Sequence, residues 1–95
     1  MLAQGLLDRI ERKLAEAQAA RWEHGQPVAI RLDPPPAMAD DALIAGLAFL
    51  VQSKAGAWVE MHREPVAKLA SEAEVDDLLA RGLSIFLMKH PAWPK

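Results

Sequence analysis

The stretch that decides the fold is Ala42-Leu-Ile-Ala-Gly-Leu-Ala-Phe-Leu-Val51, an apolar run without a single charged or polar side chain. Its large side chains point all around a helical axis, which is typical of a helix buried on every side. Asp40 or Asp41 supplies a helix cap, so we predict a central helix from there to about Lys54. Glycine costs ~1 kcal/mol relative to alanine inside a helix, so Gly46 predicts a close approach by another backbone.

Two elements precede this run. Residues 2–24 predict an amphipathic helix, because apolar side chains recur there at three- and four-residue spacing. The centre of this stripe consists of Leu7, Ile10 and Leu14. The segment Val28-Ala-Ile-Arg-Leu-Asp33 alternates apolar and polar residues, which is typical of a strand with one buried face. Pro34-Pro35-Pro36 ends this strand, since proline has no backbone N–H to donate.

A second strand is predicted for Trp58-Val-Glu-Met-His62. Its alternation places Trp58, Glu60 and His62 on one face and the two intervening apolar residues on the other. The pair Glu64-Pro65 has the composition of a turn. After this turn, Val66–Leu69 predicts a short edge strand.

The last third of the chain contains the clearest local signal. Ser71 and Glu74 form a capping box at the start of a helix, and the apolar residues that follow supply its buried face. Gly82 is expected to end this helix in the left-handed conformation that glycine adopts readily. Ser84-Ile-Phe-Leu-Met88 is then predicted to be a strand that is apolar on both faces and therefore central in the sheet.

Together these elements predict an α+β fold, with helices and strands mixed along the chain in the order α-β-α-β-(β)-α-β. We expect a single three- or four-stranded sheet packed with three helices. A chain of 95 residues has no room for two independent cores, so residues 1–95 form one compact domain. Within it we expect the N-terminal amphipathic helix at 2–24, a sheet-and-helix core at 28–90 and a tail at 91–95.

The composition indicates which cellular compartment and which classes of binding partner suit the chain. The net charge is −2, from 13 acidic and 11 basic residues, which is too balanced for electrostatic capture of nucleic acid. The apolar run at 42–51 is shorter than the ~20 residues of a membrane span, and no basic, apolar leader opens the chain. There is no cysteine, which suits a reducing compartment. We expect a soluble, cytoplasmic protein with no membrane partner.

No group of residues has the spacing of a catalytic or metal site. The three histidines lack the four-residue helical spacing of metalloproteases, and no cysteine assists them. The five glycines are isolated, so they form no phosphate-binding loop. We therefore predict no catalytic residue, no metal ligand and no cofactor.

Two other functions stay open as alternatives. Glu60 and His62 lie roughly 7 Å apart on one side of the predicted strand, so a carboxylate could orient the imidazole. With His90 they suggest a small metal-dependent or acid–base enzyme. The second alternative is a regulator that contacts nucleic acid through residues 2–24, where arginine and lysine alternate with acidic residues.

Our leading hypothesis is a non-catalytic protein-binding domain: a small stand-alone inhibitor, an antitoxin-like partner or an accessory subunit. Aromatic, methionine and arginine side chains beside charges are typical of interfaces. The partner is another protein, or a second copy bound as a homodimer through the N-terminal helix; alternatively, that helix covers the second sheet face. The candidate interaction residues are Leu7, Ile10, Leu14, Trp22, Arg31, Trp58, Glu60, His62, Phe86, Met88 and Trp93.

Overall fold

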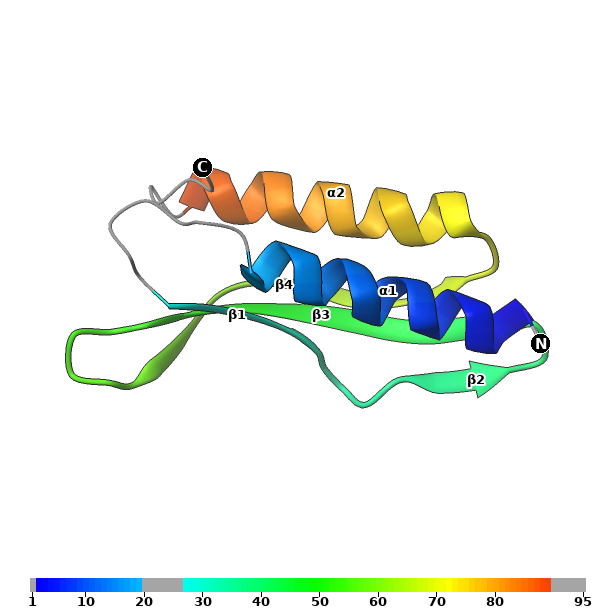
Figure 1. Cartoon of the computed structure of the whole chain (residues 1–95), viewed down its shortest axis with the longest axis horizontal. Helices are drawn as coiled ribbons and strands as arrows, with labels where there is room; N and C mark the ends of the chain where they lie inside the picture. Colours follow the sequence, from blue (N-terminus) through cyan, green and yellow to red (C-terminus); the bar gives the residue numbers. More distant parts are fainter. Residues whose placement is uncertain (1, 20–26, 90–95) are drawn as a thin grey trace.

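The computed structural model describes residues 2–19 and 27–89, which form one antiparallel sheet of four strands with two helices on it (Figure 1). The α+β class and the single sheet are therefore confirmed. The described residues contain two helices where three were predicted, and the element order is α-β-β-β-β-α. The elements are α1 (Leu2–Ala19), β1 (Val28–Leu32), β2 (Ala37–Ala39), β3 (Ala42–Gln52), β4 (Trp58–Leu69) and α2 (Glu72–Lys89).

The apolar run 42–51 is the central strand β3, so the prediction of a buried helix was wrong. β1 and β2 pair with the two halves of β3 on one side, and β4 pairs with it on the other. Leu43, Leu47 and Phe49 alternate along one face and are fully buried. On the other face Ala42 and Ala48 are also buried, at 3% and 2% exposure, although no helix of the described residues covers them. The run is therefore apolar on both faces and resembles a buried helix in sequence.

Gly46 shows the close backbone approach that its sequence context predicted, but within a strand. A Cβ atom there would lie 3.0 Å from the carbonyl oxygen of Glu64 and 3.1 Å from that of Asp33. The pairing of β3 with β4 shifts register at this point, which brings the neighbouring backbone inward. Glycine is therefore required here by the strands on both sides.

Asp40 and Asp41 do not cap a helix. Ala39 pairs with Ala42, so the two aspartates form a tight hairpin turn between β2 and β3. Asp40 has a φ of 54°, a left-handed conformation that aspartate tolerates better than most residues. Aspartate is common at both helix caps and turns, which is why the sequence alone did not distinguish them.

β4 is one continuous strand from Trp58 to Leu69, so the predicted turn at Glu64-Pro65 was wrong and Val66–Leu69 is no separate strand. Within residues 2–19 and 27–89, β4 lies at the edge of the sheet and pairs only with β3. Proline is tolerated in an edge strand, because its missing N–H can face away from the neighbouring strand.

The capping box at the start of α2 is confirmed. The backbone N–H of Glu74 donates to Ser71 Oγ at 3.2 Å, and Glu74 Oε1 accepts from the N–H of Ala70 at 3.3 Å. The first contact satisfies a donor that the first helical turn leaves without a partner, and the second binds the backbone of the residue before the cap.

The same helix continues to Lys89, so the predicted end at Gly82 and the strand at 84–88 were both wrong. Gly82 is buried inside the helix, where a Cβ atom would lie 2.6 Å from Phe49 Cζ. The buried positions of α2 keep helical spacing through this glycine: Val75, Leu78, Leu79, Gly82 and Phe86.

Both helices pack on the same face of the sheet (Figure 1). α1 contributes Leu6, Ile10 and Leu14 to the core, and α2 stacks Phe86 on Phe49 with ring centroids 5.3 Å apart. The alternative in which the N-terminal helix covers the second face of the sheet was therefore wrong. That second face carries no helix in the described part of the chain.

Candidate interaction surface

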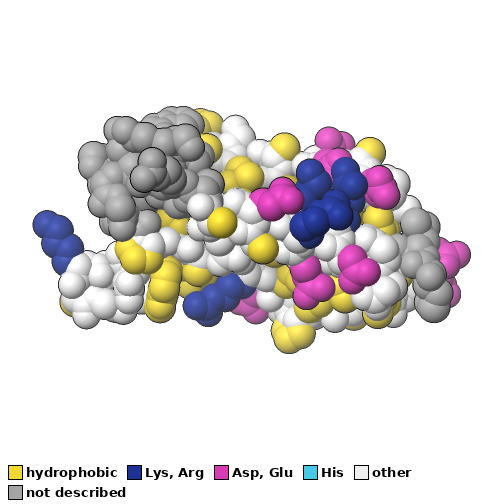
Figure 2. Space-filling model, viewed as in Figure 1, with side chains coloured by type: hydrophobic (Ala, Val, Ile, Leu, Met, Phe, Trp, Pro, Cys, Tyr) yellow, Lys and Arg dark blue, Asp and Glu magenta, His cyan; other side chains and the backbone are white. Residues whose placement is uncertain are grey.

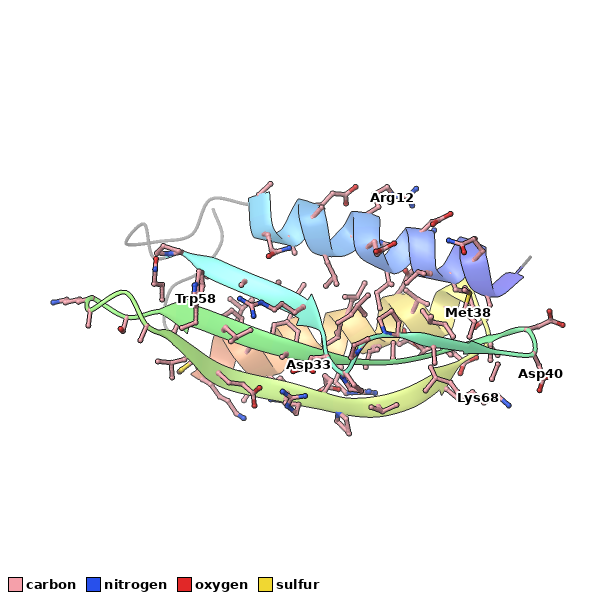
Figure 3. The ribbon with its side chains drawn as sticks, turned by 90° about the horizontal axis from the view of Figure 1, so that it is seen from below. Arg12, Asp33, Met38, Asp40, Trp58 and Lys68 are labelled. Atoms are coloured by element: carbon pink, nitrogen blue, oxygen red, sulfur yellow. The ribbon has the colours of Figure 1, made fainter. Side chains whose placement is uncertain are left out.

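The sheet face opposite the helices, which we call the open face, is viewed in Figure 3. Residues paired across neighbouring strands share a face, so the pairing identifies its members. They include the rows Ala29–Leu50–Glu60, Arg31–Ala48–Arg63 and Ala37–Ile44–Lys68, together with the pairs Ala39–Ala42 and Gln52–Trp58. The three predicted interaction residues Arg31, Trp58 and Glu60 are thus brought together on one surface.

An ion-paired group crosses the middle of the open face. The Nη2 atom of Arg63 lies 2.6 Å from Glu60 Oε1 and 2.8 Å from Asp33 Oδ2. Arg63 is on β4 and Asp33 follows β1, so the guanidinium spans the β3 strand between them at Ala48. The small side chain of Ala48 leaves room for this crossing. Hydrogen bonds to Glu60 and then to Asp33 raise the pKa of Arg63.

Other side chains on this face are open to contact. Trp58 is 42% exposed beside the β3–β4 turn (Figure 3). Arg31 and Lys68 are exposed and have no ion pair with any residue in the ranges 2–19 and 27–89. The open face therefore combines an exposed indole ring, two cations and the apolar residues of β3.

The edges of the sheet are less suited to contact than its open face. At one edge, β4 contains Pro65 and two register shifts. At the other edge, Pro34, Pro35 and Pro36 separate β1 from β2. Prolines and bulges interrupt the hydrogen-bonding pattern that an added strand needs, so extension of the sheet is disfavoured at both edges.

A buried polar cluster lies on the helix-covered face. Glu64, which is 4% exposed, accepts from Arg81 Nε at 2.7 Å and lies 2.6 Å from His62 Nε2. Lys89 Nζ lies 3.2 Å from His62 Nδ1. Burial raises the pKa of the Glu64 carboxyl, but the hydrogen bonds from Arg81 and His62 outweigh it and hold this pKa below its ordinary value. The cluster ties α2 to β4.

The chemistry of this cluster is that of a structural clamp. A lysine ammonium can only donate, so His62 Nδ1 accepts from Lys89 and Nε2–H donates to Glu64. Both ring nitrogens of His62 are thus engaged within the chain, and its side chain is only 9% exposed. A general base needs a nitrogen within reach of its substrate, and this arrangement offers none.

The predicted pairing of Glu60 with His62 was wrong. His62 lies opposite Phe49 while Glu60 lies opposite Leu50, because the register shifts by one residue between them. Neighbouring residues of β3 point to opposite faces, so Glu60 and His62 do also. His90, the third residue of that hypothesis, lies outside the described residues. The described residues contain no group of three or more His, Asp or Glu that could hold a metal ion.

The apolar stripe of α1 is used inside the chain. Ile10 is fully buried and Leu14 nearly so, while Leu7 packs against the core and is partly buried. These side chains are the ones on which the prediction of a homodimer through this helix rested. Because they face the sheet, they are not available on the surface of the folded chain.

Positive side chains of α1 gather on the surface with acidic side chains beside them (Figure 2). Arg9 binds Asp76 of α2 through two hydrogen bonds of 2.9 and 2.8 Å and lies 3.4 Å from Glu72. Lys13 lies 3.6 Å from Asp76. The hydrogen bond with Arg9 lowers the pKa of Asp76 against a smaller effect of burial. These cations therefore join the two helices.

The remaining predicted residues are scattered. Phe86 is fully buried in the core, where it stacks on Phe49. Met88 is 80% exposed near the end of α2, on a different element from the open face. Trp22 and Trp93 lie outside the described residues, so the predictions for them stay predictions.

Sequence reasoning missed the residues that build the two polar clusters. Glu64 was assigned to a turn because proline follows it, although it stands two residues after His62 and so shares its strand face. Arg81 and Lys89 are eight residues apart on one helix, a spacing that is visible only if the helix continues through Gly82. The bond from Arg63 to Asp33 was not predicted, because Asp33 lies 30 residues away in the chain.

Comparison with known proteins identified no relative: no family model, curated protein or solved structure matches the chain. Neither α1 nor α2 is long and apolar enough to cross a membrane. An inference about function therefore rests on the chain's own residues and geometry.

Proposed function

We propose that the chain is a non-catalytic protein-binding domain that contacts another protein through the open face. Small inhibitors, antitoxin-like partners and accessory subunits are domains of this kind. The observation that carries the proposal is a sheet on which both described helices lie on one face, while the other face presents Trp58 and Arg31 to solvent. Tryptophan and arginine are the residues most often found at the energetic centre of protein interfaces.

The shape of the open face supports a partner that lies flat on the sheet. The residues of β3 on this face are apolar and include the half-buried Ile44 and Leu50, which a partner that lies flat can cover. Trp58 then contributes a large rigid contact area at one end of the face. The paired charges of Asp33, Glu60 and Arg63 provide polar groups that a partner can meet with its own hydrogen bonds.

The polar clusters favour binding over the acid–base alternative. Glu60 and His62, the residues of that alternative, are divided between two faces, and the imidazole of His62 is engaged by Glu64 and Lys89. The nucleic-acid alternative is supported less than protein binding, because Arg9 and Lys13 are engaged by acidic residues of α2.

The test is affinity capture from the native cell with three baits: the natural chain, the Trp58→Ala/Arg31→Glu variant and the matched control Arg12→Glu. Arg12 is exposed on α1, away from the open face (Figure 3). We expect one dominant protein with the natural chain and with the control, and its loss with the open-face variant. Thermal melts of all three baits verify that each is folded.

Capture that survives the Trp58→Ala/Arg31→Glu exchange would contradict the proposal, and so would a partner lost equally with Arg12→Glu. A purified complex then allows a direct measurement, in which the open-face variant weakens binding by at least about tenfold, as expected for loss of an interface centre.

A further inference from the structure

A groove lies between α1 and α2 on the helix-covered side, with a volume of about 390 Å³. This volume falls within the ~300–1,000 Å³ range of small-molecule sites, and the space between packed helices is a common place for them. Its apolar lining comes from both helices and from the sheet beneath: Leu14, Ala17, Leu79, Leu83, Ile30 and Phe49.

The groove exists because small side chains replace large ones where the helices would otherwise touch. The buried stripe of α1 consists of large residues as far as Leu14 and continues as Ala17. Across the groove, α2 presents Ala80. Nearer the start of the helices, the Arg9–Asp76 ion pair joins them directly. The helices are thus held together at one end and leave an apolar space farther along.

Three charged residues stand at the rim of the groove. Asp76 is compensated by Arg9 at 2.8 Å and by Lys13 at 3.6 Å. Glu16, by contrast, has no ion pair with any residue of the described ranges. The charge that the rim leaves uncompensated is therefore a carboxylate, which lies next to an apolar space.

We propose that this groove binds a small amphiphilic amine, with its apolar body along Ala17, Ala80 and Leu83 and its ammonium group at Glu16. An apolar body gains by leaving water for a surface of aliphatic carbon. An ammonium group gains from a carboxylate that is in no ion pair of its own. The site is separate from the open face, so it stands or falls independently of the proposed partner.

A titration with three molecules of similar size and different charge tests the proposal: 2-phenylethylamine, 2-phenylethanol and 3-phenylpropionate. Backbone amide signals of the full ¹⁵N-labelled chain report both the affinity and the place of binding. We expect saturable shifts at Leu14, Ala17 and Leu83, with the amine bound about two- to fivefold more tightly than the alcohol, as one exposed charge pair allows. The carboxylate is expected to bind most weakly.

Substitutions at Glu16 and in the groove test the contributions of the charge and of the apolar space separately. Glu16→Gln is expected to remove the preference for the amine over the alcohol and to leave the binding of the alcohol unchanged. Ala17→Leu fills the groove and is expected to abolish binding of all three molecules, and Ala80→Leu does the same from α2 if the first variant does not fold. Ala15→Leu, on the exposed side of α1, is the matched control and should bind like the natural chain.

Three results would overturn the proposal. The first is the absence of saturable binding by any of the three molecules. The second is a carboxylate that binds as tightly as the amine, since the rim would then not select a cation. The third is binding that persists in folded Ala17→Leu and Ala80→Leu chains, which would place the molecule elsewhere.

Discussion

Strand β4 carries two glutamates, Glu60 and Glu64, that face opposite sides of the sheet and are each bound by an arginine. Glu60 binds Arg63 on the open face, where its side chain is 42% exposed. Glu64 binds Arg81 beneath α2, where it is 4% exposed. The chemistry of the two pairs is the same, and their surroundings differ.

This difference separates a structural ion pair from one that is free to change partners. Removing one member of a buried pair leaves a charge or hydrogen-bonding group without water, which is costly. An exposed pair contributes little to stability, because water replaces the lost contact. Charges on the open face can therefore be offered to a binding partner, whereas those beneath α2 hold the helix on the sheet.

The largest expected effect is that of Glu64→Ala. It removes the acceptor for both Arg81 and His62, and we expect a loss of about 3 kcal/mol in the free energy of unfolding, at the lower end for a broken buried pair because Arg81 reaches solvent. Urea denaturation measures the loss, and Glu60→Ala is the matched control with a much smaller effect. Equal losses for the two variants would remove the distinction between the faces.

The next effect concerns the glycine that makes room for this cluster. Gly82→Ala places a methyl group 2.6 Å from Phe49 Cζ and 3.2 Å from Glu64 Cγ, and the fully buried Phe49 has little room to move. We expect a loss of about 1–2 kcal/mol despite the better helix propensity of alanine.

The control for this substitution is Gly5→Ala in α1, where a Cβ atom meets no other atom within 4 Å. Here the propensity gain is unopposed, so we expect a more stable chain by up to about 1 kcal/mol. Thermal melts of the two variants should therefore shift in opposite directions. A shift in the same direction would show that Phe49 yields to the added methyl group.

The sequence allowed the local features to be predicted. The alternation of β1 and the capping box of Ser71 and Glu74 depend on residues a few positions apart, and both are present as expected. The predicted close approach of another backbone at Gly46 was also correct, because a glycine leaves room for a neighbouring backbone in a strand as it does in a helix.

Two of the errors of secondary structure have one physical origin. The run 42–51 is rich in alanine and leucine, which favour helix, but pairing with strands on both sides overrides that preference. Residues 84–88 favour strand, yet Phe86 continues the helical spacing of Val75, Leu78 and Leu79. In both places tertiary contacts decide, and a short apolar run alone does not reveal them.

The errors in the candidate site follow from these. Residues 42–51 form the central strand and not a helix, so the described residues contain two helices. Both pack on one face of the sheet and leave the other face open. The face of His62 was predicted incorrectly because a one-residue register shift reverses the direction of the side chains that follow it, as far as the second shift near Pro65. Such shifts arise from pairing with a distant strand, so they leave little trace in the sequence.

The third and smaller expected effect is on the pH dependence of the free energy of unfolding. The pKa of Glu64 is lowered in the folded chain, so the unfolded state binds more protons as the pH falls through the carboxyl range. The stabilisation by Glu64 is therefore present above its ordinary pKa and is lost as the pH falls through the lowered folded value.

The comparison that isolates this effect is the natural chain against Glu64→Gln. Asp76, whose pKa is also lowered, contributes equally to both and cancels. We expect the difference in unfolding free energy to be largest near neutral pH and to shrink as the pH falls below the ordinary carboxyl range. A difference that stays constant with pH would mean that the carboxyl of Glu64 is not the group responsible.

The smallest expected effect is that of Arg63→Met on the open face. Methionine keeps an aliphatic stem beside Ala48 and removes the ion pairs with Glu60 and Asp33, which water can replace. We expect a slight change in the melting temperature, and one that vanishes in 1 M salt, where exposed charges are screened within about 3 Å. If the change instead exceeded that of Gly82→Ala and persisted in salt, Arg63 would be holding β1 to β4 across β3. The open face would then be a structural surface like the one beneath the helices, with no charges to offer a partner.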